Sequence, residues 1–525
     1  MKKTKRLASI ALSSLFLLPA VFSLTGCGEK ADVTLRVFSW EEYIDEGGEG
    51  SYAYDMLADG EELEDEDMSS MVKRFEKWYE KEYHETVRVK YSTFGTNEDM
   101  YNKLLLGKEY DLLCPSDYMI MKLAAENRII PYDEEFFDPA IEKNYYVRNV
   151  SPYIQGVFEE GKVAVPDKET GESPLRSWSE YAAGYMWGTT GLVYNPEDVD
   201  ETELKELGYN AFIHPGYKNK ITTKDNVRDT YFAALGLTYQ SDLLEEIKNG
   251  NFGAVTEIFN RTDADTVAEV YKKLMEMKKN IYGFETDTGK ADLVSGKIWL
   301  NYAWSGDAVY AMDLAENEDE TLLNYYVPDA GSNLWFDGWV MTRSVEKRGT
   351  KKAAQAFVNF LSMPENAKRN SYYIGYTSVI AGEEQEMLEY ADYLYGIEEE
   401  EEENYYDLSY FFYTPEEIAQ GETAFIYAEE DQRLRRQLYA QFPPEEVIER
   451  CAVMNYFDPD TNERINELWA KVKAESLDAW AITVICVAVV AIALFIVFVK
   501  FGDKFDFFHR KPKKGYTLVD QRPAK

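Results

Sequence analysis

Apolar and polar residues follow one another in a repeating order along the first third of this chain. The stretch at 33–40 alternates in hydrophobicity and is rich in β-forming residues, whereas 68–83 has apolar residues at helical spacing. The same alternation continues to about residue 128. We expect strands at 33–40, 86–94 and 110–114, and helices at 68–83, 97–107 (capped by Asn97) and 118–128. Such βαβ units build a parallel sheet, so the pattern predicts an α/β fold with ligands at the carboxyl ends of the strands.

Aromatic and polar side chains recur where later strands are expected to end. The stretch 185–195 resembles a strand pair, 220–236 runs from a strand into a helix, and 297–312 does the same. A single aromatic residue in a strand is more often part of the core than of a ligand site. Tryptophan beside Ser, Asp or Gly at several turns is harder to explain as core, and favours a shared polar and aromatic cleft.

The N-terminal segment has the layout of an export signal. Lysine and arginine precede an apolar run, which ends in Leu24-Thr25-Gly26-Cys27. This pattern resembles a bacterial lipobox, so we expect residues 1–26 to be a signal peptide and Cys27 to carry lipid. The alternative is an ordinary signal peptide with an unrelated cysteine.

The C-terminal part contains an uncharged run at 479–499, with Trp480 at its edge and a basic segment after it. About 20 residues suffice to cross a hydrocarbon core of about 30 Å. This predicts a transmembrane helix at 479–499 and, by the positive-inside rule, a cytoplasmic tail at 500–525. The body would then lie on the extracytoplasmic face of the cell membrane, held by both the lipid and the helix.

Composition excludes several classes of function. The net charge of −39 argues against nucleic acid and against anionic lipid surfaces as partners. The chain has three histidines and no C-x-x-C pair, phosphate-binding loop, dinucleotide motif or nucleophile elbow. We therefore expect a binding protein rather than an enzyme, with no cofactor and no metal. Two cysteines of the body, Cys114 and Cys451, could form a disulfide, but their spacing leaves this open.

Several motifs, taken in order, resemble one family. They are "FSWEEYI" (38–44), residues 92–123, "YMWGTTGLVYN" (185–195), "TTKDNVRD" (222–229), "WSGDA" (304–308), "LWFDG" (334–338) and "IGYTSV" (374–379). Over roughly 33–475 the chain resembles the spermidine/putrescine-binding proteins of bacterial polyamine ABC transporters. The resemblance implies two α/β lobes, a hinge and a cleft between the lobes. Lobe 1 would comprise 33–187 and 335–380, and lobe 2 would comprise 188–334 and 381–475.

The resemblance also implies a ligand site, carried over position by position. The implied ligand-binding residues are Trp40, Glu41, Tyr43, Ser116, Tyr118, Asp225, Asn226, Asp229, Trp304, Trp335, Asp337, Tyr376 and Asn455. Glu41, Asn226 and Asn455 depart from the residue types usual in the family, which leaves the preferred polyamine open. Asp117 is a weaker candidate than Ser116 and Tyr118.

The function implied is the capture of a polyamine for an ABC importer, whose permease subunits would be the partners. Carboxylates suit the ammonium groups of such a ligand, and aromatic faces suit both its cations and its methylenes. The alternative is another solute on the same fold, such as ferric ion, a thiamine-like cation or an amino acid.

Overall fold

The computed structural model describes residues 31–48, 51, 68–167, 170–398, 401–474, 483–484 and 486–492. The expected signal peptide at 1–26, Cys27 and the tail at 500–525 lie outside these residues, as does most of the acidic segment at 46–68.

The first strands and helices form as the hydrophobic pattern predicts. β1 (Val33–Trp40) lies between β2 (Val87–Phe94) and β3 (Leu112–Leu113), and both pairings are parallel. The crossovers contain α2 (Met71–Tyr83) and α3 (Asn97–Leu105), and α4 (Asp117–Ala125) follows β3. One detail is corrected: α3 is capped by Thr96, whose hydroxyl accepts from the Asp99 amide, because Asn97 is already the first helical residue and its side chain is engaged elsewhere.

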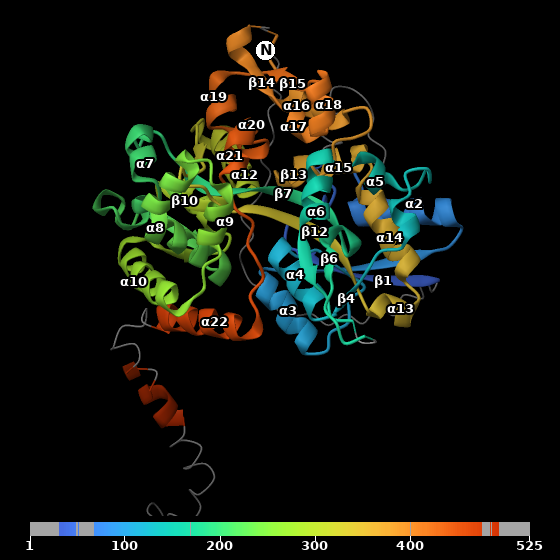
Figure 1. The fold of residues 1–525 in the computed structure, drawn as a ribbon, viewed down its shortest axis with the longest axis horizontal. Helices are drawn as coiled ribbons and strands as arrows, with labels where there is room; N and C mark the ends of the chain where they lie inside the picture. Colours follow the sequence, from blue (N-terminus) through green and yellow to red (C-terminus); the bar gives the residue numbers. More distant parts are fainter. Residues whose placement is uncertain are drawn as a thin grey trace, which may run out of the picture. The chain divides into compact units, whose positions relative to one another are not determined.

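Two long strands join the two halves of the molecule. β7 (Ala182–Tyr194) was expected to be a strand pair, but it is a single strand that is buried along its whole length. Its first half pairs antiparallel with β12 (Leu334–Thr342), and its second half pairs with β10 (Leu300–Trp304) and β11 (Asn324–Tyr326). The resulting sheet runs β2-β1-β3-β12-β7-β10-β8-β9, where β8 is Ile221–Lys224 and β9 is Gly283–Glu285. In Figure 1, β7 and β12 run across the middle between two groups of helices.

We call the elements around β1, β2, β3 and β12 lobe 1 and those around β8, β9 and β10 lobe 2. Helices of lobe 2 follow its strands: α8 (Val227–Lys248) begins after β8, α11 (Gly289–Val294) after β9 and α12 (Ser305–Asp319) after β10. The two-lobed α/β architecture expected from the sequence is therefore present.

Further helices and strands complete the two lobes. They are β4 (Ile129–Ile130), η1 (Glu134–Phe137), α5 (Tyr145–Asn149), α6 (Pro152–Glu160), β5 (Lys162–Ala164), β6 (Leu175–Ser177), η2 (Trp178–Glu180), α7 (Glu201–Leu207), η3 (Gly208–Ile213), η4 (Pro215–Tyr217), α9 (Phe252–Phe259), α10 (Ala264–Asn280), α13 (Ser344–Arg348), α14 (Lys351–Leu361), α15 (Pro364–Ile374), β13 (Thr377–Ser378), α16 (Glu386–Tyr395), η5 (Glu402–Asn404), β14 (Tyr405–Asp407), α17 (Ser409–Phe412), α18 (Pro415–Gln420), β15 (Phe425–Tyr427), α19 (Glu430–Leu434), α20 (Gln437–Gln441), α21 (Glu445–Glu449) and α22 (Pro459–Ala474).

The expected fold is corrected at its C-terminal end. Among the described residues, no helix is both long enough and apolar enough to cross a membrane, so the predicted transmembrane helix at 479–499 is not supported. Of that segment, 483–484 and 486–492 are described and helical, and the rest lies outside the described residues.

Aromatic side chains from distant segments fill the core near the crossing strands. Trp187 on β7 is fully buried, and its ring is nearly parallel to those of Phe336, at a centroid distance of 6.4 Å, and Phe411, at 5.7 Å. Trp187 therefore packs the core. Cys114 and Cys451 are both buried free thiols, so the disulfide that the sequence left open does not form.

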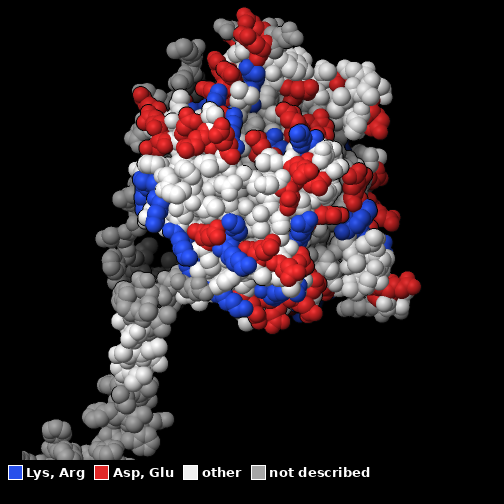
Figure 2. Space-filling view, turned by 60° about the vertical axis from the view of Figure 1, so that its left-hand side comes forward, with Lys and Arg blue, Asp and Glu red and all other residues white. Residues whose placement is uncertain are grey.

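The surface carries both signs of charge. Figure 2 shows basic side chains interspersed with acidic ones, and the acidic ones gather at the upper and lower ends of the face in view. No continuous basic strip crosses this face, which agrees with the large acidic excess of the sequence.

Candidate ligand-binding site

Two strand ends bring aromatic residues from the two lobes together. Trp40 ends β1 in lobe 1 and Trp304 ends β10 in lobe 2, and their ring centroids lie 6.4 Å apart. The indole N–H of Trp304 donates to Oδ1 of Asp229 at 3.3 Å, in the first turn of α8. Three of the predicted site residues are thus neighbours, although they are separated by up to 264 positions in the sequence.

A second group surrounds Asp337, at a bulge in β12. The Tyr43 hydroxyl donates to Oδ2 of Asp337 at 2.6 Å. The Tyr376 ring lies 5.2 Å from the ring of Tyr43 and 5.6 Å from the ring of Trp335, measured between centroids. Tyr43, Trp335 and Tyr376 thus form an aromatic cluster, and Tyr43 connects it to the Asp337 carboxylate.

The turn before α4 contributes Ser116 and Tyr118. Asn97 connects them, because its Nδ2 donates at 3.1 Å both to the Ser116 hydroxyl and to the Tyr118 hydroxyl. Ser116 also forms an isolated β-bridge with Asp337. One face of the Tyr118 ring is covered by the guanidinium of Arg228 from lobe 2, 4.2 Å from the ring centroid.

The two carboxylates of the site are buried. Burial raises the pKa of Asp337 to about 6, with a further rise from the negative charge of Asp229. Burial likewise raises the pKa of Asp229 to about 6, against the lowering effects of the hydrogen bond from Trp304 and of the nearby Lys224 and Arg228 charges. Oδ1 of Asp337 is buried and has no hydrogen-bond partner among the described residues. A cation entering the site would supply the missing charge and donors.

Asp117 has a different environment from these two. Its carboxylate accepts from the backbone amides of Tyr118 at 2.5 Å and Phe336 at 3.1 Å, and so ties the start of α4 to β12. Burial raises its pKa to about 8. Both carboxylate oxygens are therefore used by the fold.

Asp225 lies half-buried in the turn before α8. Three other predicted site residues do not join these groups through their side chains, in the contacts given for the described residues. Asn226 caps α8 by accepting from the Arg228 amide at 2.7 Å. Glu41 is exposed. Asn455 is exposed and contributes its backbone carbonyl, which accepts from Arg228.

Sequence reasoning missed a cluster of charged residues behind Trp304. Lys224 contacts Asp307 at 2.9 Å and Glu285 at 3.4 Å, and Lys290 contacts Asp307 at 3.5 Å. Lys290 also reaches Glu42 of lobe 1 at 4.0 Å. The signal available in the sequence was the position of Lys224 and Asp307 at strand ends, but nothing there indicated that they pair.

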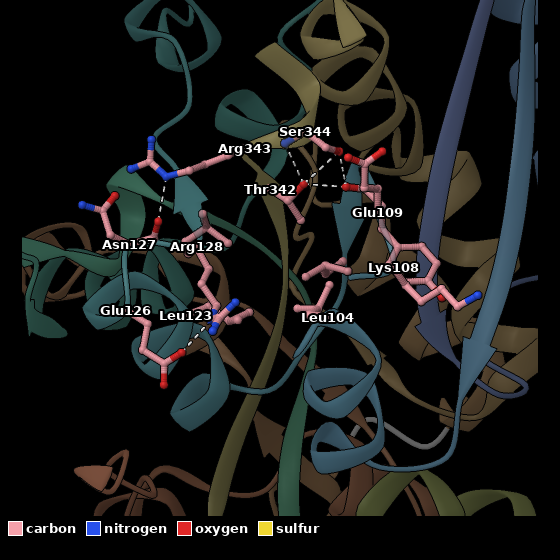
Figure 3. Close-up of a pocket in the computed structure, with 13 residues that line it drawn as sticks. Leu104, Lys108, Glu109, Leu123, Glu126, Asn127, Arg128, Thr342, Arg343 and Ser344 are labelled. Carbon is pink, nitrogen blue, oxygen red and sulfur yellow. Dashed lines mark hydrogen bonds and ion pairs between the residues drawn. The ribbon is translucent and has the colours of Figure 1, made fainter. Parts of the chain in front are cut away.

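A cavity of about 390 Å³ lies away from the predicted residues, beside the C-terminal end of β12. Figure 3 shows Thr342, Ser344 and Arg128 around it, with Arg128 bonded to Glu126 at 2.6 Å. None of the predicted ligand residues lines it. Among the described residues, no cluster of three or more His, Cys, Asp or Glu side chains could hold a metal ion.

A family model described as "Bacterial extracellular solute-binding protein" matches residues 70–393. The chain belongs to this family. The spermidine/putrescine-binding periplasmic protein of Salmonella typhimurium is 26% identical over 292 residues, which is 55% of this chain and 70% of that protein. The putrescine-binding periplasmic protein PotF of Escherichia coli is 24% identical over 352 residues, 66% of this chain and 77% of that protein.

Solved structures support the fold. A putative spermidine/putrescine ABC transporter protein from Listeria monocytogenes superposes with a TM-score of 0.53 at 22% identity, covering 84% of this chain and 98% of that one. Family membership confirms the expectation of an extracytoplasmic solute-binding protein rather than an enzyme.

Proposed function

We propose that this protein binds a polyamine of the spermidine/putrescine type and delivers it to the permease of an ABC importer. The observation that carries the proposal is the pair of buried carboxylates, Asp229 from lobe 2 and Asp337 from lobe 1, both with pKa values raised to about 6. The names of the relatives point to the same class of ligand.

The chemistry of the site suits a chain of methylenes that carries ammonium groups. An ammonium group near Asp337 would find the unpartnered Oδ1. A second near Asp229 would find a carboxylate whose one hydrogen bond from the described residues is the 3.3 Å bond from Trp304. The rings of Trp40, Trp335 and Tyr376 would flank the methylenes. Each cation over a ring adds about 0.5–2 kcal/mol, and micromolar affinity needs only about −8 kcal/mol in total.

Within this proposal, residues differ in their roles. Tyr43 orients Asp337, while Asn97 positions the hydroxyls of Ser116 and Tyr118. Asn226 and Asn455 act through the fold rather than through ligand contacts, and Asp225 and Glu41 remain candidates for the rim of the site.

The proposed location is the extracytoplasmic side of the membrane. Residues 1–26 would direct export and be removed, and a lipid on Cys27 would hold the mature protein at the membrane. Mass spectrometry of the mature N-terminus tests this: a lipid-modified Cys27 is expected, and an unmodified N-terminus elsewhere would contradict it.

Isothermal calorimetry with putrescine, spermidine and ferric ion tests the ligand class. We expect a polyamine to bind and ferric ion to give no heat. Asp229→Asn should weaken polyamine binding at least tenfold, whereas Asp242→Asn, an exposed position on the same helix, should leave it unchanged. Absence of heat with both polyamines, or heat with ferric ion alone, would refute the proposal.

A further inference from the structure

Lys224 places a positive charge of the protein itself at one end of the candidate site. It is the last residue of β8, and its side chain is 1% exposed. Its Nζ lies 4.3 Å from the ring centroid of Trp304, the tryptophan that also contacts Trp40 and Asp229. This is the geometry in which a bound ammonium group would meet an aromatic face.

Asp307, the carboxylate nearest to Lys224, already has two protein cations as partners. Lys224 contacts Asp307 and Glu285, and Lys290 contacts Asp307 from another side. Burial alone would raise the pKa of Asp307, but Lys224 and Lys290 lower it to about 2. The Tyr376 hydroxyl also donates to Asp307, at 3.0 Å. Lys290 also contacts Asp287 at 2.7 Å and Glu42 at 4.0 Å, and Asp307 is the carboxylate that both lysines contact.

The two carboxylates proposed to bind ligand have a different balance. Oδ1 of Asp337 has no hydrogen-bond partner, and no lysine or arginine forms an ion pair with Asp229 or Asp337 among those that the described residues make. Asp229 is compensated only in part, by the nearby charges of Lys224 and Arg228, whereas Lys224 contacts Asp307 directly and covers one face of Trp304.

We propose that Lys224 determines specificity, because its ammonium group occupies the subsite at Trp304 and Asp307 that a third ammonium group would otherwise fill. The protein then prefers a diamine, with one ammonium group for each of the two free carboxylates, over a longer triamine. This inference rests on the proposed function, since it concerns which polyamine that site selects.

Calorimetry with putrescine and spermidine on three proteins tests the role of Lys224. The wild type should bind putrescine at least tenfold more tightly than spermidine. Lys224→Met, which keeps an unbranched side chain one atom shorter and removes its charge, should shift the affinity ratio at least tenfold toward spermidine. Lys224→Arg should retain the wild-type preference, because it keeps the charge.

A control variant at Lys220 and a second neutral variant at Lys224 complete the test. Lys220 immediately precedes the same strand, with its Nζ 4.9 Å from the ring centroid of Trp299, and Lys220→Met should leave the ratio unchanged. If thermal unfolding shows that Lys224→Met is not folded, Lys224→Gln removes the charge but keeps a donor for Asp307. Glu285 keeps its bonds from the Gly289 amide and Asn301 in both variants.

The outcomes separate this inference from the proposed function. A wild type that binds spermidine as tightly as putrescine, or a ratio that the neutral variants leave unchanged, overturns the role of Lys224 and leaves polyamine binding intact. Failure of every protein to bind either polyamine overturns both.

Discussion

Asp337 is a buried carboxylate that has a hydrogen-bond donor for only one of its two oxygens among the described residues. Tyr43 donates to Oδ2, whereas Oδ1 is buried without a hydrogen-bond partner among the described residues. Burial disfavours ionisation and raises the pKa to about 6, against the lowering effect of the Tyr43 hydrogen bond, so a bound cation would favour the ionised form. Asp117 is equally buried, but two backbone amides occupy its oxygens. We therefore assign Asp337 to ligand binding and Asp117 to stabilising the fold, because Asp117 has donors for both of its carboxylate oxygens.

Replacement of Asp337 by asparagine should separate binding from stability. We expect Asp337→Asn to lower the affinity for putrescine at least tenfold, because the amide carries no negative charge. The unliganded variant should be more stable than the wild type by about 2–3 kcal/mol at pH 8, since a carboxyl with a raised pKa loses stability as the pH rises through about 6. Calorimetry and chemical denaturation measure the two effects.

The stability gain in Asp337→Asn should vanish at pH 4, where the wild-type carboxyl is also neutral. Asp242→Asn serves as the control, because its carboxylate is exposed and neither effect is expected. An Asp337→Asn variant with wild-type affinity would exclude this carboxylate from the site.

Affinity should also depend on pH in a defined direction. A cation favours the ionised forms of Asp229 and Asp337, whose pKa values are about 6 in the free protein. Affinity should therefore be constant above pH 7 and fall about tenfold or more by pH 5. Calorimetry in buffers of different protonation enthalpy should detect protons released on binding near pH 6. Binding that is independent of pH between 5 and 8 would contradict the raised pKa values.

Sequence patterns located the residues at strand ends better than they assigned their roles. Trp304 and Asp229 were singled out and do lie together, because the parallel strands β10 and β8 present their ends at one edge, and Trp40 meets them from lobe 1. The capping role of Asn226 and the pairing of Lys224 with Asp307 could not be predicted, since each depends on a contact set by packing. A strand end shows where a side chain emerges but not which partner it meets.

At the scale of elements, local periodicity predicted the parallel part of the sheet well. β1, β2 and β3, with the helices between them, follow the expected order because each has its own hydrophobic pattern. β7 was expected to be two strands rather than one continuous strand of 13 residues. Instead, neighbours far away in sequence pair with it along its length and keep it extended.

The start of α12 makes a close contact that only glycine allows. A Cβ at Gly306 would lie 2.0 Å from Cδ2 of Tyr376. Tyr376 precedes β13, which pairs with β7 beside lobe 1, whereas α12 follows β10 of lobe 2. The absence of a side chain at Gly306 therefore lets the two halves of the site meet.

Gly306→Ala should disturb this contact without unfolding the protein. Tyr376 would have to move and would lose its 3.0 Å hydrogen bond to Asp307. We expect ligand affinity to fall by about 1–3 kcal/mol, measured by calorimetry. Gly253→Ala on α9, where no atom lies within 4 Å of the added Cβ, should bind like the wild type. Equal affinities for both variants would show that the contact is not needed in the bound state.

At the scale of the whole solute-binding body, several contacts hold the two lobes together, while one pair of like charges pushes them apart. Glu42 with Lys290 and Tyr376 with Asp307 connect them, and the tryptophans Trp40 and Trp304 pack together. Asp229 and Asp337 lie on opposite lobes and raise the energy of the arrangement when both are ionised. A bound cation or a proton would relieve that repulsion.

Lowering the pH should therefore bring the lobes of the unliganded protein closer together, as adding ligand does. At pH 8, small-angle scattering should show a decrease in the radius of gyration when putrescine is added, because the ligand neutralises both carboxylates and favours closure. Without ligand, the radius should be smaller at pH 5 than at pH 8, since protonation removes the same charges. A double variant, Asp229→Asn with Asp337→Asn, should be compact at both pH values. A wild-type radius that changes with neither ligand nor pH would mean that these carboxylates do not control the distance between the lobes.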